Sequence, residues 1–299
     1  MNFADYLKSQ RIQAARVAGV GGTDDGRGST LGAWLAPLAL GMVEWLVYAA
    51  SIAPLIRPVD DSGRRANLTY TASCYRATAR ARSWLLHTIG DRLLFGYSQG
   101  AEAAGNAYTL HINRDHDMSG TTLLLIADPR GWPTALKPWL SGGRLRRWVV
   151  SHCGVTLNGY RGVIEAGNGC VYSVAILGDP ITAVETWRNP LGLVSNLIGF
   201  FKIHSGLGVE SAAVIGDLQV LCEQQSGNTR QVVLYATHPF TQLLPFVPEW
   251  FAELIAPRTV PGEEAATLFR SRKEIVRQLE RARRGNARQE HVAASLDAA

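Results

Sequence analysis

A serine with a glycine two positions away on each side is the residue with the clearest chemistry in this sequence. The segment Gly96–Gly100 (GYSQG) follows a short apolar run, Leu93–Phe95, and precedes a run of small residues at 101–107. An apolar run that ends at a turn predicts a buried strand, and the small residues predict a helix packed closely against a sheet. Ser98 would then lie in a tight strand-to-helix turn that exposes its hydroxyl, as a nucleophile in acyl transfer requires.

A serine nucleophile also needs donors for the negative charge that develops on the substrate oxygen. The backbone N–H of Gln99, at the start of the predicted helix, is expected to be one of these oxyanion-hole donors. The loop after the early strand predicted at 14–20 could supply the second, through the backbone of Thr23 or Asp24. The same glycine-rich stretch, 21–28, is equally well interpreted as a flexible connection. It does not match the phosphate-binding P-loop, which needs lysine and then serine or threonine after its last glycine.

Two aspartates are candidates for the acid of a catalytic triad. Asp128 and Asp179 directly follow predicted buried strands, at 121–127 and 170–177, and each precedes a proline. The carboxyl ends of parallel strands meet at one edge of a sheet, which is where ligands bind. Either aspartate therefore satisfies the order serine, aspartate, histidine that is typical of α/β-hydrolases.

Two histidines are candidates for the base. His204 follows a predicted helix at 189–203 and precedes a glycine-rich stretch, whereas His238 follows a predicted strand at 231–236. Both follow the serine and both aspartates in the chain, so order alone does not choose between them. Four other histidines are expected to be ordinary surface or core residues. His87, His111 and His116 lie on or near the predicted helices that flank the serine, and His152 lies in a weakly patterned insertion.

Strands that alternate with helices predict the α/β class, with a mostly parallel central sheet flanked by helices. Hydrophobic patterning predicts a helix at 31–43 that leads into a buried strand at 45–50. It also predicts a helix at 73–89, with Ala77, Ala81, Leu85 and Ile89 on one face. The segment 130–143 is expected to be a surface loop, and 144–169 is expected to contain hairpins.

Composition and charge narrow the function classes. The 299 residues are 46% hydrophobic and 18% charged, as expected of a globular protein. The net charge of +5 lies mostly at 257–290, which contains nine Lys/Arg and five Asp/Glu. The predicted hydrolase domain is therefore nearly neutral, which does not favour nucleic-acid binding. We predict an α/β-hydrolase domain at 1–256 and a basic C-terminal helix with a disordered tail at 257–299.

No metal, cofactor or membrane span is expected. The apolar stretch 31–56 is long enough to span a bilayer, but Pro37, Glu44 and Pro54 interrupt it. The first residues contain no apolar core of a signal peptide, so the protein is expected to be cytoplasmic until released, or to act at the cell envelope. Reduced thiols are therefore expected at four cysteines that lack metal-ligand spacing: Cys74, Cys153, Cys170 and Cys222.

Several motifs resemble those of a known enzyme group. The segment Gly96–Ala101 (GYSQGA) resembles the nucleophile turn of cutinases and their relatives. Other segments resemble motifs of PE-PPE-domain hydrolases of actinobacteria, although Ala49 stands where that family has proline. Mycobacteriophage lysin B esterases share the serine turn and the order serine, aspartate, histidine. The resemblance covers roughly 15–245 and includes these further segments: Val20–Thr23, Val47–Ser51 with Ala53–Leu55 after it, Ala127–Arg130, Ser173–Asp179 and Lys202–Gly206.

The resemblance implies a serine esterase that acts on long-chain acyl or mycolyl esters of the actinobacterial envelope, with peripheral contact with envelope lipid. It implies a triad of Ser98, Asp179 and His204, and leaves Asp128 and His238 as the alternatives. The apolar stretch 31–56 and the segment 131–140 would suit a wall for an acyl chain, or else core packing and a surface loop. An acyltransferase with the same triad and a catalytically silent envelope or lysis partner are the other function classes. The sequence does not specify an oligomeric state.

Overall fold

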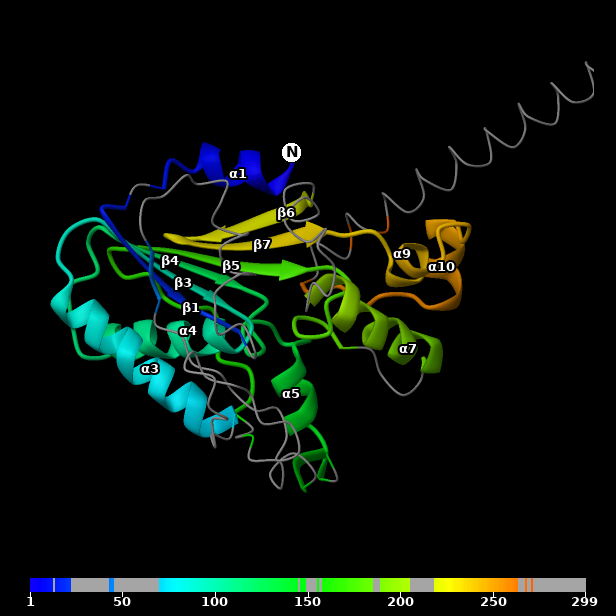
Figure 1. Cartoon of the computed structure of the whole chain (residues 1–299), viewed down its shortest axis with the longest axis horizontal. Helices are drawn as coiled ribbons and strands as arrows, with labels where there is room; N and C mark the ends of the chain where they lie inside the picture. Colours follow the sequence, from blue (N-terminus) through cyan, green and yellow to red (C-terminus); the bar gives the residue numbers. More distant parts are fainter. Residues whose placement is uncertain are drawn as a thin grey trace, which may run out of the picture.

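The strands of this protein form one sheet in an α/β fold. The computed structural model describes residues 1–12, 14–22, 43–45 (backbone only), 70–144, 146–148, 155, 158–184, 189–204, 218–262, 267 and 270. Their strands make a seven-stranded sheet in the order β2-β1-β3-β4-β5-β7-β6 (Figure 1). All neighbouring strands are parallel except β6 and β7, which confirms the predicted class and the mostly parallel sheet. The strands are β1 (Arg16–Val20), β2 (Val43–Trp45), β3 (Arg92–Tyr97), β4 (Thr121–Ile126), β5 (Cys170–Ile176), β6 (Gln219–Ser226) and β7 (Thr229–Tyr235).

Helices cover both faces of the sheet, because successive side chains of a strand point to opposite faces. In β3, Leu93 and Phe95 pack in one core with the first helix, α1, whereas Leu94 packs on the other face with α3 and α4 (Figure 1). The remaining helices follow the carboxyl ends of β4, β5 and β7. The helices are α1 (Phe3–Ser9), α3 (Tyr70–His87), α4 (Gln99–Ile112), α5 (Leu136–Ser141), α7 (Pro190–Gly199) with the π-helix η2 (Phe200–His204), α9 (Pro239–Leu243) and α10 (Glu249–Ile255).

Two predicted segments differ from the structure. The segment 130–143, predicted as a surface loop, contains α5, in which Lys137 is 3% exposed. The predicted apolar face of the helix at 73–89 is wrong at its end. Ile89 is 93% exposed, because α3 stops at His87 and Gly90 turns the chain with a φ of 84°.

Some elements were not predicted, and some predictions fall outside the described residues. The patterns did not predict α1, β6, α9 or α10. Of the strand expected at 45–50, only Trp45 is described, as the last residue of β2. No strand forms in the described part of 144–169. Cys74, Cys170 and Cys222 are not joined to one another by a disulfide. Four predicted features lie wholly or mostly outside the described residues: the helix at 31–43, the segment Val47–Ser51, Cys153 and the C-terminal helix. No described helix is long and apolar enough to cross a bilayer.

The junction of β3 and α4 depends on two close backbone approaches. A Cβ placed on Gly96 would lie 2.6 Å from the carbonyl oxygen of Gly100. A Cβ on Gly100 would lie only 1.9 Å from the carbonyl oxygen of Val20, at the end of β1. Neither contact involves a side chain that could move aside, so a larger residue must displace the helix from the sheet.

We predict that Gly100→Ala lowers the free energy of unfolding by about 3 kcal/mol or more, since overpacking against rigid backbone is strongly destabilising. Gly159→Ala is the matched control, because the nearest atom to its added Cβ is the Ser141 hydroxyl oxygen at 3.8 Å. Urea unfolding of both variants measures the difference. Equal midpoints for the two variants would contradict the close approach of α4 to β1.

Candidate active site

Ser98 lies in a strained turn between β3 and α4. Its φ of 55° and ψ of −121° are unusual for a residue with a side chain, and its N–H donates to the carbonyl of Ile126 on the neighbouring strand at 2.9 Å. Ser98 is also the N-cap of α4 but forms no side-chain capping hydrogen bond there. Strained residues of this kind cluster at functional sites. The turn thus places Ser98 at the carboxyl edge of the sheet, as the sequence predicted, but the residue is buried, at 7% exposure, where the sequence predicted an exposed hydroxyl.

A chain of hydrogen bonds joins Ser98 to the two residues that the resemblance favours. His204 Nε2 lies 2.8 Å from Ser98 Oγ, and His204 Nδ1 lies 2.9 Å from Asp179 Oδ2. All three residues are buried, and Asp179 is 0% exposed. In the tautomer with its proton on Nδ1, His204 donates to Asp179 and accepts from the Ser98 hydroxyl. This arrangement can remove a proton from the serine and hold the resulting imidazolium against a carboxylate.

Packing from both sides fixes the ring of His204, the last residue of η2. The Tyr97 ring stacks on the imidazole with ring centroids 5.0 Å apart, and the Phe200 ring stacks with centroids 5.5 Å apart. The Tyr97 hydroxyl donates to the backbone carbonyl of His204. Asp179 follows β5, and its second carboxylate oxygen accepts from the N–H of Ile181 at 2.8 Å. The acid and the base are therefore each held by more than their mutual hydrogen bond.

The alternative acid and base lie in other hydrogen-bond arrangements. Arg161 donates to one carboxylate oxygen of Asp128, and the N–H of Arg130 donates to the other at 2.9 Å. His238 Nδ1 accepts from the N–H of Phe240 at 3.1 Å, and its Nε2 lies 2.9 Å from the carbonyl oxygen of Ala256. Both ring nitrogens of His238 are thus engaged with backbone, and His238 is 0% exposed.

The first turn of α4 and the segment that follows β1 both lie beside Ser98. The N–H of Gln99 belongs to this first turn, where N–H groups have no partner within the helix. Thr23, the other predicted donor, lies outside the described residues. Its neighbour Gly22 lies directly against the turn, since a Cβ there would be 3.2 Å from Ser98 Cβ. The chain that leads to Thr23 therefore reaches the serine.

A buried ionic cluster holds the first turn of α4 against its neighbours. The sequence did not predict this cluster. Glu102, 1% exposed, accepts from Lys137 Nζ at 2.6 Å and from the Tyr70 hydroxyl at 2.7 Å. The side-chain amide of Gln99 donates to the Tyr70 carbonyl at 2.9 Å. Burial and the Glu102 carboxylate raise the pKa of Tyr70 well above its usual value, so its phenol stays a donor. The cluster ties α3 and α5 to the residues that follow the nucleophile.

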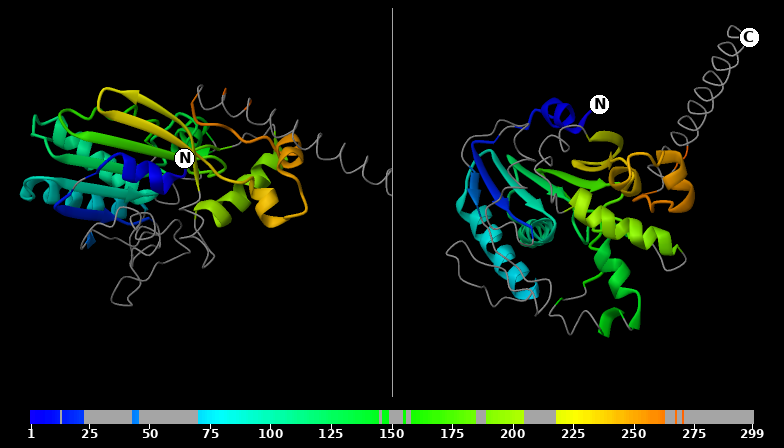
Figure 2. Two further views of the ribbon diagram at one scale, coloured as in Figure 1. Left: turned by 90° about the horizontal axis from the view of Figure 1, so that it is seen from above. Right: turned by 45° about the vertical axis from the view of Figure 1, so that its right-hand side comes forward.

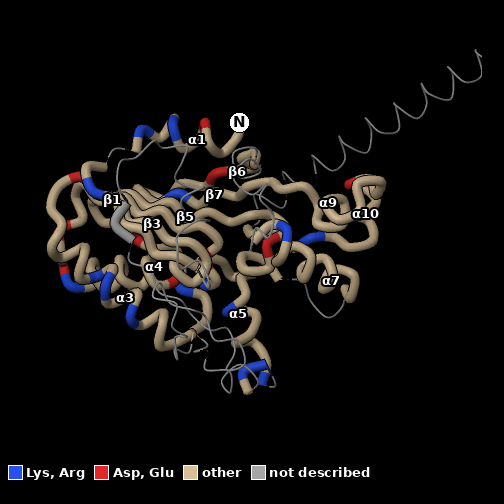
Figure 3. The backbone as a smooth tube through the Cα atoms, viewed as in Figure 1, with Lys and Arg blue, Asp and Glu red and all other residues tan. Residues whose placement is uncertain are grey.

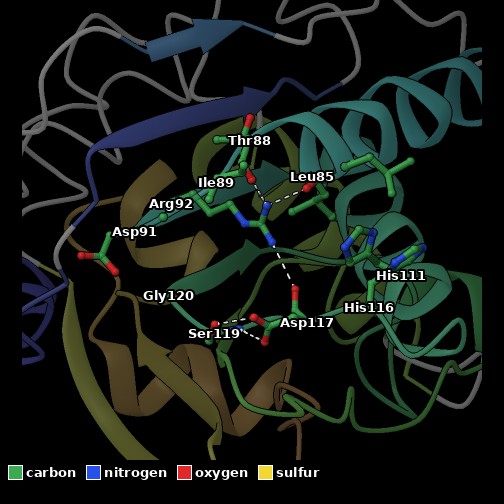
Figure 4. A pocket seen from close by; sticks show the side chains of 12 residues that line it. Leu85, Thr88, Ile89, Asp91, Arg92, His111, His116, Asp117, Ser119 and Gly120 are labelled. Carbon is green, nitrogen blue, oxygen red and sulfur yellow. Dashed lines mark hydrogen bonds between the residues drawn. The ribbon is translucent and has the colours of Figure 1, made fainter.

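A surface cleft of about 450 Å³ opens at the opposite end of the sheet. Arg92, the first residue of β3, donates there to the carbonyls of Leu85 and Thr88 (Figure 4). His111 and His116 face one another with ring centroids 4.4 Å apart, and burial, with a smaller effect of His116, lowers the pKa of His111 to about 4. The lining residues include no serine–histidine pair like that at the triad. Among the described residues, no group of three or more His, Cys, Asp or Glu is placed to hold a metal ion.

Comparison with known proteins gives only distant likeness in structure. No protein-family model matches the sequence, and no curated protein sequence matches it. The type II thioesterase YbtT of the yersiniabactin pathway is similar at 13% identity, with a TM-score of 0.35, over 58% of this chain and 80% of its own. Carboxyl esterase 2 of the fungus Tuber melanosporum shows 12% identity and a TM-score of 0.33, over 57% and 60%. The RedJ thioesterase of Streptomyces coelicolor shows 16% identity and a TM-score of 0.32, over 59% and 73%.

We predict that Lys137→Met lowers the free energy of unfolding by about 3–5 kcal/mol, because it leaves the Glu102 carboxylate buried without its nearest cation. Adding Glu102→Gln should recover much of that loss, since the unpaired charge is then gone. Urea unfolding of the single and double variants measures both effects.

The exposed ion pair of Arg230 with Glu223 supplies the control. Its two side chains are 30% and 26% exposed, so Arg230→Met is expected to cost about 1 kcal/mol or less. A Lys137→Met variant no less stable than Arg230→Met would show that the buried cluster does not hold α4.

Proposed function

We propose that this protein is a serine hydrolase that cleaves carboxylic esters, with Ser98 as nucleophile, His204 as general base and Asp179 as the acid of the triad. The observation that supports this most directly is the continuous hydrogen-bond chain from Ser98 Oγ through both nitrogens of His204 to Asp179. The strained backbone of Ser98 supports it independently.

The chemistry follows from the positions of these atoms. Ser98 Oγ attacks the carbonyl carbon of the ester, and its proton moves to His204 Nε2. The N–H of Gln99, with a donor from the loop that begins at Gly22, stabilises the negative oxygen of the tetrahedral intermediate. His204 then gives its proton to the departing alcohol, which leaves an acyl-enzyme. Water, activated by the same histidine, releases the acid and regenerates the serine.

Asp179 acts through His204 and does not contact the substrate. Its hydrogen bond to Nδ1 holds the tautomer in which Nε2 accepts, and its charge stabilises the imidazolium. The Ile181 N–H that binds its other oxygen fixes the carboxylate in that orientation. Asp128 already pairs with Arg161, and His238 caps α9, so we assign both a structural role.

For the substrate we propose an ester with a long acyl chain, of the mycolyl type, because the motifs around Ser98 resemble those of cutinases, PE-PPE-domain hydrolases and lysin B esterases. Trp132, in the segment expected to line an acyl chain, instead packs into the core with Ala175 and Val233. That side chain is therefore not available to the substrate. An acyltransferase with the same triad differs only in using a sugar hydroxyl in place of water, and a silent partner would not need this hydrogen-bond chain.

We predict that Ser98→Ala, His204→Ala and Asp179→Asn each reduce hydrolysis of a short p-nitrophenyl ester by about 10³-fold or more, since triad residues act as a unit. Circular dichroism checks that each variant is folded. Asp128→Asn and His238→Gln are the matched controls. Each of these variants, per molecule of folded protein, should hydrolyse the ester at the rate of the parent. A dead but folded Asp128 or His238 variant beside an active Asp179 or His204 variant would overturn the assignment.

We predict that kcat/KM rises as the acyl chain lengthens from acetate, because each buried methylene contributes about 0.8 kcal/mol. A series of p-nitrophenyl esters measures this trend, and a preference for acetate over every longer ester would contradict the lipid substrate.

With an envelope lipid extract, a hydrolase releases free acid whether or not trehalose is added. Diversion of the acyl group into a new trehalose ester would instead identify a transferase.

A further inference from the structure

The helices beside the catalytic end of the sheet expose many large apolar side chains. Of the eighteen large hydrophobic residues that are exposed in the described part of the chain, half lie in two short stretches, 190–199 and 243–255. We call this set the apolar face. Its exposed fractions run from 36% to 80%. The members are Leu191, Val194, Leu197, Leu243, Leu244, Phe246, Phe251, Leu254 and Ile255.

These residues belong to helices that pack together. Helix α7 contacts α9, and α9 contacts both η2 and α10. Figures 1 and 2 show α7, α9 and α10 grouped beyond the carboxyl ends of β5 and β7. Because α7 continues directly into η2, which ends at His204, the α7 part of the apolar face is continuous with the segment that carries the proposed catalytic base.

The polarity of α7 is inverted relative to an ordinary surface helix. Its buried positions are Gly192, Ser195, Asn196 and Gly199. Three of its five large apolar residues, Leu191, Val194 and Leu197, are 46%, 47% and 59% exposed, and the other two are half-buried. A helix in water normally buries its apolar stripe. Contiguous exposed apolar surface marks a site of interaction.

The tip of the apolar face is a short loop between α9 and α10. Phe246 is 80% exposed and lies between Pro245 and Pro248. The prolines restrict the backbone there, so the loop presents the aromatic ring with little conformational freedom to lose.

The charged side chains on these elements are few and balance one another. Glu253 and Glu249 both pair with Arg258, at 2.5 Å and 3.2 Å. Within 190–204 and 239–258, the other charged side chain is Lys202, which is exposed on η2. Figure 3 shows few charged residues on α7, α9 and α10.

We propose that the apolar face docks the protein on an anionic lipid surface, with Phe246 and Leu197 inserted between the lipids. Binding of this kind combines buried apolar side chains with attraction between basic groups and anionic lipid. The attraction to such a surface comes from the net charge of +5 of the whole sequence, most of which lies at 257–290 and not on the apolar face. The same net charge repels a second copy of this chain, which favours lipid over self-association as the occupant. The biological purpose rests on the proposed function, because docking places the serine beside its lipid ester.

Vesicle flotation tests the docking separately from catalysis. The protein carries Ser98→Ala throughout, and the vesicles contain equal parts of phosphatidylglycerol and phosphatidylcholine, or phosphatidylcholine alone. We expect the parent to float with the anionic vesicles and less with the neutral ones. Leu197→Gln combined with Phe246→Gln should weaken partitioning about tenfold or more. Ile89→Gln, at a still more exposed apolar residue at the opposite end of the sheet, should bind like the parent.

Further readouts decide between the occupants. In the active protein, the Leu197/Phe246 double variant should keep its rate on a soluble acetate ester and lose rate on a lipid ester in vesicles. Equal flotation of parent and double variant would overturn the proposal. So would a dimer in sedimentation equilibrium that the double variant dissociates, without any vesicle binding. If the triad assignment fails but flotation behaves as expected, the docking surface stands and only the proposed chemistry falls.

Discussion

The positive φ of Ser98 is the constraint on which the site depends. A residue with φ of 55° and ψ of −121° cannot continue a strand or begin a helix in the ordinary way, so the chain turns sharply and α4 runs back along the sheet. That turn is compatible with the fold only if α4 touches the backbone of β1 and β3, which requires glycine at 96 and 100. The hydrogen bond from Ser98 N–H to Ile126 then anchors the strained residue to the neighbouring strand.

Ser98 and His204 come from different parts of the chain, and Tyr97 joins them. Tyr97 is the last residue of β3, adjacent to Ser98 in the chain, yet its ring stacks on His204 and its hydroxyl binds the His204 backbone. The Glu102 cluster holds the other side of the turn through Lys137 and Tyr70. The geometry between Ser98 and His204 is therefore fixed from both the strand and the helix that flank the serine.

Patterns of adjacent residues in the sequence predicted those elements whose structure depends on residues close together in the chain. The buried strands and the serine turn are recognisable because their apolar runs and glycines are adjacent in sequence. The choice of His204 over His238 came from the resemblance, since both histidines follow suitable elements and only the packing engages the nitrogens of His238 with backbone. Lys137 was not predicted as a core residue, because its partner Glu102 is 35 residues away. Strand β6 is half exposed at the sheet edge and has little apolar alternation to reveal it.

The small residues on the inner face of α7 and the large apolar residues on its outer face have separate physical causes. A Cβ on Gly199 would lie 2.2 Å from the carbonyl oxygen of Gly178, next to Asp179, so bulk on the inner face would push His204 away from its acid. This close approach to the residue before Asp179 thus explains the glycine at position 199 on the inner face of α7. It does not explain Leu191 or Leu197 on the outer face, because polar side chains there would leave the triad unchanged and be better solvated. Several exposed leucines clustered beside the proposed base are more favourable when something apolar covers them, which is the physical reason for the proposed lipid surface.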